Sequence, residues 1–450
     1  MADTIRQPLA NAENPVLQGN YAPVTAEVTA HDLPVTGTIP EDLSGTLYRD
    51  GPNPVNPQPG HHWFIGDAML HGISLAGGRA TAYRNRWVRT KAVEEAKGLP
   101  AAPLSPNQPM VQGSGNVNVI GHGGRILALP EIGLPWEMGA DLATVGQYDY
   151  AGRLKSSMTA HPKIDGRTGE LLFFGYDFGP VFLRYHVAAP DGTLKRTIDI
   201  AKPYGTMMHD FAVTATRVVF MDFPVVFDLE MAMSGRRLPF TWRDDLPARL
   251  GILSRDAETD TTLWIETDPC YVYHPLNAFD DGARIVIDVV RHPKTFVAGN
   301  LEGAGGHSRL ERWTIDPDAG IVDRVIVDDR GQEFPRVDPR LECHPHRYGY
   351  CVEFALGRDP GNLIRHDMQT GTRQIHDVGP GGAASEGVFV PRGPGEDNGW
   401  LLSVVYEAES DSSHLRIIDA ADFTAPPVAK VHLPQRVPFG FHGNWVPGMG

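Results

Sequence analysis

Residues 205–228, with the sequence GTMMHDFAVTATRVVFMDFPVVFD, contain the pattern that decides the fold. The stretch predicts the end of one strand that carries His209, a turn at residues 214–217, and an apolar strand over residues 218–227. A histidine at a strand end can point into a cavity. A single histidine in this setting is more often a structural residue than a ligand, so the prediction depends on whether the setting recurs.

The same setting recurs at three other histidines. His161 lies in TAHPKIDGRTGELLFFGY, before a glycine-containing turn and an apolar strand, and His274 lies in YVYHPLNAFDDGARIVIDVV in the same way. His442 lies between aromatic residues in VPFGFHGNWVP near the C-terminus. Four histidines from four distant segments can meet only if the fold brings strand ends to one axis.

Apolar, β-branched runs separated by glycine, aspartate and asparagine turns extend along the whole chain, which predicts an all-β fold. Turn pairs such as Asp191-Gly192 and Asp281-Gly282 predict hairpins. Short helices are expected only at residues 93–97 and 229–234. The 49 glycines and 38 prolines are spread evenly and mark no linker, so residues 1–450 are expected to form one domain.

An all-β chain of this length favours a β-propeller over a sandwich. Seven blades would average about 64 residues each, which is an ordinary blade size once long loops are included. The histidines lie 48, 65 and 168 residues apart, so they would fall on different blades and meet near the central channel.

Charge and cysteine usage narrow the class of function. The chain has 40 Lys and Arg against 55 Asp and Glu, a net charge of -15. This acidic balance argues against nucleic acid as a partner and favours a protein that binds a small molecule. The three cysteines are odd in number and do not occur as CxxC pairs, so the sequence shows no disulfide framework. This usage suits a reducing compartment. With no apolar N-terminal segment and no run of 18 apolar residues, the sequence predicts a cytoplasmic protein.

The four histidines are interpreted as metal ligands. Neutral imidazoles suit iron, zinc or copper, but they leave the charge of the ion uncompensated. Carboxylates that accept a hydrogen bond from these rings without binding the metal themselves, called outer carboxylates here, would orient the rings and offset that charge. Glu131, Glu333 and Glu386 lie in apolar contexts where an unpaired carboxylate is costly to bury. The alternative is that each caps a turn or pairs with an arginine such as Arg336.

A second cluster of potential ligands is Cys343-His344-Pro345-His346. No second pair of ligands stands at zinc-finger spacing from it. It is expected to be a surface loop.

Ordered motifs along residues 33–447 give the chain its resemblance to a known family: LYRDGPNP, TAHPKIDGRTGE, MMHDFAVT, YHPLNAF, EFPRVD, SEGVFVPR and FHGNWVP. At these motifs the chain resembles the carotenoid cleavage oxygenases. The resemblance implies a seven-bladed β-propeller with a dome of loops and short helices over the metal face, preceded by an N-terminal extension of residues 1–32. It implies Fe(II) held by His161, His209, His274 and His442. Glu131, Glu333 and Glu386 would be hydrogen-bonded to the last three of these histidines.

The reaction implied by the resemblance is cleavage of a conjugated carbon–carbon double bond of a carotenoid or apocarotenoid with O2, giving two carbonyl products. Family members take hydrophobic substrates through an apolar patch and tunnel, which implies peripheral association with a membrane. Residues 238–240, Trp242 and the loop 99–110 are candidates for the patch and the tunnel entrance. The candidates for the tunnel are Phe64, Trp136, Phe240, Trp242 and Phe279.

Three alternative functions remain open within the resemblance. Stilbene-cleaving members carry a lysine just before the first outer glutamate and a tyrosine in the preceding loop. Here that lysine position is Pro130, and residues 98–109 contain no tyrosine, which favours a polyene substrate. An isomerohydrolase and a non-catalytic polyene-binding propeller are the other two alternatives. The presence of all four histidines and all three glutamates favours an oxygenase.

Overall fold

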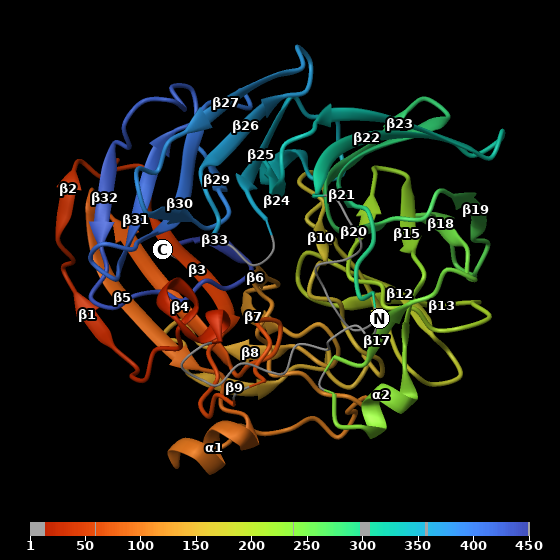
Figure 1. Cartoon of the computed structure of the whole chain (residues 1–450), viewed down its shortest axis with the longest axis horizontal. Coiled ribbons are helices and arrows are strands. Elements are labelled where there is room, and N and C mark those ends of the chain that lie inside the picture. The colour runs from red at the N-terminus through yellow and green to blue at the C-terminus, as the bar shows by residue number, and fades with distance from the viewer. Residues whose placement is uncertain (1–13, 59, 237, 298–306, 356–358, 449–450) are drawn as a thin grey trace, which may run out of the picture.

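Short antiparallel sheets repeat along the chain and form a ring around one axis (Figure 1). The computed structural model describes residues 14–58, 60–236, 238–297, 307–355 and 359–448. Within these ranges there are seven sheets of four or more strands and one two-stranded ribbon. The prediction of an all-β, seven-bladed propeller is confirmed.

The seven sheets are the blades, numbered here in chain order. Blade 1 contains β1 (Thr29–His31), β5 (Arg79–Trp87), β4 (Ala68–Ala76), β3 (Gly45–Pro52) and β33 (Gly443–Pro447). Blade 2 contains β6 (Asn118–His122), β7 (Arg125–Leu129), β8 (Trp136–Met138) and β9 (Thr144–Gln147). Blade 3 contains β10 (Lys163–Ile164), β11 (Leu171–Tyr176), β12 (Leu183–Ala188) and β13 (Leu194–Ile200).

The remaining blades follow the same meander. Blade 4 contains β14 (Phe211–Val213), β15 (Arg217–Asp222), β18 (Ala248–Ser254) and β19 (Leu263–Thr267). Blade 5 contains β20 (Tyr271–Asp281), β21 (Arg284–His292), β22 (Arg309–Asp316) and β23 (Ile321–Asp328). Blade 6 contains β24 (Gln332–Val337), β25 (Tyr348–Glu353), β26 (Leu363–Asp367) and β27 (Thr372–His376). Blade 7 contains β2 (Val35–Gly37), β32 (Ala429–His432), β31 (Ser412–Asp419) and β30 (Gly399–Glu407), with β28 (Gly382–Ala384) and β29 (Val388–Pro391) both paired to β30.

The predicted hairpin turns are present. Gly192 joins β12 to β13 with φ at +86°, and Gly282 joins β20 to β21 with φ at +62°. Glycine populates these positive φ values without the steric penalty that other residues meet. Asp281 pairs with Arg284 at the tip of the second hairpin, so the turn fixes the register of the strand that carries His274.

The ring is closed at two places by strands from opposite ends of the chain. β33 pairs with β3 in blade 1, and β2 pairs with β32 in blade 7. Gly443 makes the first closure possible, because a Cβ there would lie 2.2 Å from the carbonyl oxygen of Tyr48. Part of the segment expected as an N-terminal extension belongs to the ring, since β1 pairs with β5. Residues 1–13 of that segment lie outside the described residues.

Few other elements accompany the blades. They are the helices α1 (Lys91–Lys97) and α2 (Leu229–Met233), the ribbon of β16 (Val225–Phe227) and β17 (Phe240–Trp242), and the 3-10 turns η1 (Pro15–Leu17), η2 (Gly19–Tyr21) and η3 (Pro339–Leu341). The two helices were expected from sequence. In α1 the Thr90 side chain accepts the N–H of Val93, and Gly98 ends the helix in the left-handed conformation.

The stretch that was used to predict the fold differs from the prediction in two respects. His209 does not end a strand but lies two residues before β14, which begins at Phe211. The apolar run after the turn is also not one strand, because β15 ends at Asp222 and the chain continues as β16 from Val225. Pro224 interrupts the run, since proline has no N–H to donate to a ladder.

The expectation that residues 343–346 form a surface loop was wrong. Cys343, His344 and His346 are 1%, 5% and 9% exposed. The Asn277 side chain holds this turn by accepting the N–H of Cys343 and donating to the carbonyl oxygen of His344. His344 also lies 3.1 Å from the carboxylate of Asp165. Local sequence showed none of these partners, which come from blades 3 and 5.

Apolar side chains fill the space between neighbouring blades. The largest cluster joins blades 3, 4 and 5 and includes Phe174, Phe220 and Trp313, each 0% exposed. Burying a large apolar side chain stabilises a fold by about 1.5–3 kcal/mol. Because each blade is packed on both faces, its innermost strand is held rigidly at the axis.

Candidate metal centre

All four predicted histidines lie on an innermost strand or within two residues before one. His161 precedes β10, His209 precedes β14, His274 lies in β20, and His442 precedes β33. These strands belong to blades 3, 4, 5 and 1. The fold therefore brings four distant segments to one axis, as the recurring setting predicted.

The three glutamates come from the other three blades. Glu131 follows β7 in blade 2, Glu333 lies in β24 of blade 6, and Glu386 lies between β28 and β29 of blade 7. Each of the seven blades thus contributes one residue to the same centre.

Local irregularities of the backbone aim these side chains inward. The pairing of β20 with β21 shifts register between Val272 and Pro275, on either side of His274. The pairing of β24 with β25 shifts directly after Glu333, where Phe334 has φ at +54°. Such bulges reorient a side chain next to a site. A positive φ at a bulky residue is strained, and the surrounding packing must hold it.

The imidazole rings are packed closely together. The ring of His161 lies 4.4 Å from that of His209, 5.0 Å from that of His274 and 4.8 Å from that of His442, between centroids. The rings of His274 and His442 are 4.7 Å apart. Within the described residues, His161, His274 and His442 form a buried three-histidine site whose potential ligand atoms lie within 4.8 Å of one another. The potential ligand atoms of His161, His209 and Glu131 also lie within 4.8 Å of one another, and in this group His209 and Glu131 are only partly buried.

Each of three histidines has a carboxylate at its Nδ1. The distance is 2.6 Å from His274 to Glu333 and 2.9 Å from His442 to Glu386. His209 Nδ1 lies 2.8 Å from Glu131, although the contact is oblique and neither atom makes a well-aligned hydrogen bond. The family resemblance implied that the three glutamates support these three histidines but left the pairing of each glutamate with its histidine open. Because a carboxylate only accepts, the rings of His274 and His442 hold their proton on Nδ1 and leave the Nε2 lone pair free.

His161 has a different environment. Its Nδ1 lies 3.8 Å from the Asp210 carboxylate, beyond hydrogen-bond range, and its Nε2 is buried without a hydrogen-bond partner. Asp210 is instead held by Lys163, with 2.8 Å between the ammonium nitrogen and the carboxylate. His161 therefore lacks the direct carboxylate support of the other three histidines.

Burial and neighbouring charges set the protonation of the centre. Burial, reinforced by the surrounding imidazoles, holds the pKa of His161 well below its usual value, and burial lowers the pKa of His442 to about 4. Burial opposes the charged form of Glu386, but Arg336 and His442 outweigh it and bring the pKa of this carboxyl down to about 2. The rings of His161 and His442 are therefore neutral and Glu386 is ionised, which is the state that metal ligation requires. At His209 burial opposes the charged form, but Glu131 outweighs it and raises the pKa of that ring.

The residues fit a bound cation. The Nε2 atoms of His274 and His442 face each other at 3.1 Å, although the Nδ1 protons of both rings are directed at carboxylates. Two lone pairs at this distance repel unless a cation lies between them. The buried Nε2 of His161 has no hydrogen-bond partner, so it is free to take part as well. A set of imidazole nitrogens of this kind suits iron, zinc or copper.

An apolar cavity ends at this centre. Its wall includes aromatic side chains together with His209, His274 and His442, and the full lining is Trp63, Phe64, Val117, Glu131, Met207, His209, Leu238, Phe240, Tyr273, His274, His292, Glu333, Phe334, Phe354, Phe441 and His442.

Of the five tunnel candidates, Phe64 and Phe240 line this cavity and three do not. Trp136 is 2% exposed in the core between blades 1 and 2, where its indole N–H donates to Gly113. Phe279 contacts the ring of His346 and the guanidinium of Arg312. Trp242 donates its indole N–H to Asp244 next to the cavity wall.

Two residues of the site were missed in the sequence. His292 ends β21, lines the cavity and lies 2.7 Å from Glu333. Tyr176 ends β11 and donates its hydroxyl to Glu131 at 2.9 Å. A signal for His292 was present, because it precedes a proline at a strand end, as His161 and His274 do. Tyr176 gave no comparable signal.

Fold and site together define a seven-bladed propeller with a histidine metal centre on its axis, open to an apolar cavity. The family described as retinal pigment epithelial membrane protein matches residues 21–447. The chain is 41% identical to the carotenoid cleavage oxygenase of Mycobacterium tuberculosis, over 97% of this chain and 98% of that protein. It is 33% identical to the carotenoid 9,10(9',10')-cleavage dioxygenase of Crocus sativus, over 96% of this chain and 88% of that one.

A solved structure of a related protein also matches this chain in fold and sequence. The crystal structure of Pseudomonas brassicacearum lignostilbene dioxygenase matches with a TM-score of 0.88 and 29% identity, over 98% of this chain and all of that one. The chain belongs to the carotenoid cleavage oxygenase family and is an enzyme of that class, an oxidoreductase.

The metal assignment predicts a large effect of removing one histidine. His274→Ala should lose most bound iron and all turnover, a larger loss than the about 10- to 100-fold that follows a change in an outer carboxylate. Iron per chain is measured after anaerobic loading with Fe(II) and desalting. His432→Ala, at an exposed histidine of β32, is the matched control and should keep its iron. Normal iron and turnover in His274→Ala would remove His274 from the centre.

Proposed function

We propose that this protein is a non-haem Fe(II) dioxygenase that cleaves a conjugated carbon–carbon double bond of a carotenoid or apocarotenoid with O2, giving two carbonyl products. The observation that carries the proposal is the apolar, aromatic cavity whose wall includes the imidazoles of His209, His274 and His442, three of the four proposed ligands. A hydrocarbon chain in the cavity would lie directly against the histidines.

In this proposal the four histidines, His209 included, bind the iron through Nε2. When bound, ferrous iron supplies the activation of O2 that the cleavage needs. Glu333 and Glu386 hold the proton on Nδ1 of His274 and His442 and so keep the opposite nitrogen available. Glu131 takes the same role toward His209. The three carboxylates also offset the charge of a divalent cation among neutral ligands.

The cavity wall supports a polyene as substrate. The rings of Trp63, Phe64 and Phe441 pack together, with centroids of Trp63 and Phe441 4.7 Å apart. Burial of apolar area drives a hydrocarbon into such a site at about 25 cal/mol per Å². The same surface excludes water from the reacting bond. No lysine or arginine is among the described residues that line the cavity.

A stilbene substrate is the second candidate, because the lignostilbene dioxygenase structure is so similar to this one. A buried phenolate needs a cationic or hydrogen-bonding partner. Pro130 offers no donor, and Lys202 is already engaged by Thr206 and Asp222 away from the cavity. The hydroxyl of Tyr273, the one tyrosine in the described lining, lies 2.8 Å from that of Thr295. These contacts favour the polyene.

The choice of substrate is tested by comparing the two substrate classes side by side. Purified, iron-loaded protein is given resveratrol and an apocarotenal in parallel, and the aldehydes formed are identified by chromatography. The apolar wall predicts that the apocarotenal is cleaved and that resveratrol is cleaved slowly or not at all. Faster cleavage of resveratrol than of every carotenoid offered would replace the polyene with the stilbene.

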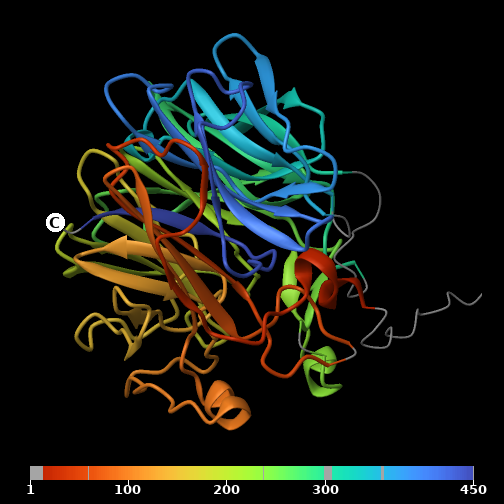
Figure 2. The same ribbon diagram turned by 90° about the vertical axis from the view of Figure 1, so that its left-hand side faces the viewer.

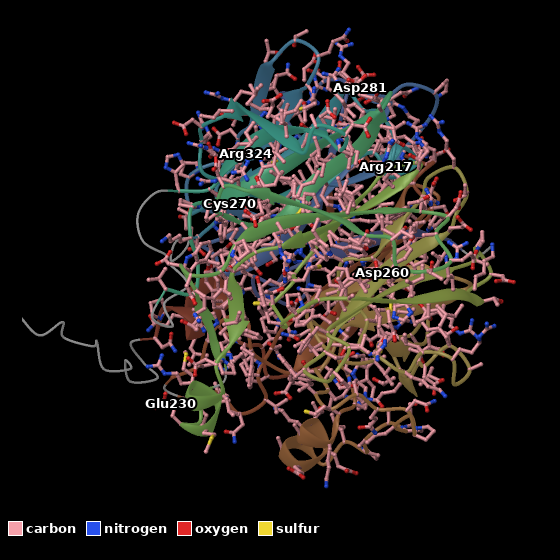
Figure 3. The ribbon with its side chains drawn as sticks, turned by 90° about the vertical axis from the view of Figure 1, so that its right-hand side faces the viewer. Arg217, Glu230, Asp260, Cys270, Asp281 and Arg324 are labelled. Carbon is pink, nitrogen blue, oxygen red and sulfur yellow. The ribbon has the colours of Figure 1, made fainter. Side chains whose placement is uncertain are left out.

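We also propose that the protein works as a cytoplasmic protein bound peripherally to a membrane, from which it takes its substrate. Among the described residues, no helix has the length and apolar character to cross a bilayer. Helix α2 presents Leu229 and Met233, 65% and 81% exposed and four residues apart on one face. The chain then leads to Leu238 and Phe240 in the cavity wall. Figure 3 places α2, marked by Glu230, at the edge of the molecule, and the turned view of Figure 2 agrees.

Removal of these two apolar side chains should weaken binding to vesicles. Leu229→Glu with Met233→Glu replaces apolar contacts by charges that anionic lipid repels. The fraction that sediments with phosphatidylcholine–phosphatidylserine vesicles should fall, while turnover of a detergent-dissolved substrate stays the same. Ile321→Glu, at an exposed position of β23, is the control. Equal sedimentation of the double variant and the wild type would exclude α2 as the contact.

A further inference from the structure

Each of the three outer carboxylates uses one oxygen for its histidine and the other for a further donor. For Glu333, Oε2 accepts from His274 at 2.6 Å and Oε1 accepts from His292 at 2.7 Å. For Glu131, Oε2 lies against His209 and Oε1 accepts the Tyr176 hydroxyl at 2.9 Å.

Glu386 follows the same pattern with a backbone donor. Its Oε2 accepts from His442 at 2.9 Å, and its Oε1 accepts the N–H of Gly443 at 2.5 Å. Because Gly443 directly follows His442, this carboxylate is held by the strand that carries its own histidine. Glu131 and Glu333 have no such built-in donor on their Oε1 atoms and depend on side chains instead.

We propose that Tyr176 and His292 are positioning residues of the metal centre, which orient Glu131 and Glu333 and thereby the rings of His209 and His274. The proposal rests on the assignment of the histidines as metal ligands made above. It adds a layer of hydrogen bonds outside the carboxylates, in which each side chain acts through a glutamate and touches no metal.

The physical reason is the freedom of a carboxylate held at one oxygen. A glutamate bound only through Oε2 can rotate about its last side-chain torsion, which has a broad energy minimum. A second donor on Oε1 fixes that torsion. It thereby fixes the position of Oε2 and the orientation of the imidazole that donates to it. Phe334 adds a backbone N–H to Oε2 of Glu333 at 2.7 Å, but Oε1 is held by His292.

The positions of the two residues suit this role. Tyr176 and His292 are 3% and 7% exposed, so water does not compete for their hydrogen bonds. Both end the second strand of a blade, one step outward from the axis: Tyr176 on β11 and His292 on β21. His292 pairs with Tyr271 at the start of the strand that carries His274. Tyr176 lies in blade 3 and supports Glu131 of blade 2, so it also links two blades.

The direction of each hydrogen bond is determined by chemistry. An ionised carboxylate has no hydrogen to give, so Tyr176 and His292 are the donors. Hydrogen bonds to a charged group in a buried site are stronger than those between neutral groups. Loss of either donor leaves one carboxylate oxygen without its partner.

Tyr176 gives the cleaner test, because it does not appear in the cavity lining while His292 does. Tyr176→Phe removes one hydroxyl and keeps the ring. Tyr185→Phe is the matched control, since Tyr185 is equally buried in the same cluster and its hydroxyl has no hydrogen-bond partner. The probe is Co(II), whose dissociation constant is measured by competition with a chelator and whose visible spectrum reports the geometry of its ligands.

We expect Tyr176→Phe to weaken Co(II) binding by about 2- to 10-fold, the effect of one net hydrogen bond. Its visible spectrum should shift, and Tyr185→Phe should match the wild type in both measurements. His292→Phe should have an effect of the same size. His292→Gln keeps an N–H donor and should recover most of the affinity and the wild-type spectrum.

Metal binding by the wild type distinguishes failure of this inference from failure of the proposed function. A wild type that binds no Co(II) or Fe(II) would remove the metal centre and this inference together. A wild type that binds metal, with Tyr176→Phe and His292→Phe unchanged in affinity and spectrum, would overturn the inference alone. Variants that lose thermal stability but keep the wild-type Co(II) spectrum would also overturn it, because a purely structural role predicts that result.

Discussion

A carboxylate buried in an apolar interior is stable only when its charge is compensated, and carboxylates of this kind surround the axis of the propeller. Glu333 and Glu386 are 3% and 2% exposed. Leaving such a charge without a partner costs several kcal/mol. The partners are the imidazoles of His274 and His442, and burial lowers the pKa of His442 to about 4. At Glu386 and His442 an ionised acid therefore faces a neutral ring, and a cation shared among the rings would compensate the remaining charge.

This arrangement depends on the closure of the ring. One residue from each blade contributes to the centre, so a displacement of any blade would move one ligand or one carboxylate. Gly443 serves both the closure of the ring and the geometry of the metal centre. It permits β33 to approach β3, and its N–H holds Glu386 next to His442. The C-terminal strand β33 and the histidine before it are therefore part of the site as well as of the fold.

The histidines could be predicted because each stands beside an innermost strand, and strand patterns are local. The glutamates could be predicted because their apolar neighbours make an unpaired charge costly. The pairing of each glutamate with its histidine could not be predicted, since spacing in the sequence does not show which blades are neighbours.

The errors share a physical cause. Cys343, His344 and His346 have the sequence of a surface loop but are buried by partners from other blades. Trp136 and Phe279 have the right chemistry for a tunnel, but the faces of β8 and β20 that carry them point into packing contacts. Tyr176 and His292 act through contacts to Glu131 and Glu333 that only the closed ring creates.

The central claim is that four histidines from four blades share one metal ion. The most direct test is a crystal structure of the Fe(II)-loaded protein with an anomalous difference map at the iron edge. The account predicts one peak, about 2.0–2.2 Å from the Nε2 atoms of His161, His209, His274 and His442, as for other imidazole–metal bonds. A peak bound directly by Glu131 or Glu333, a peak that excludes one of the four histidines, or no peak on the axis would contradict it.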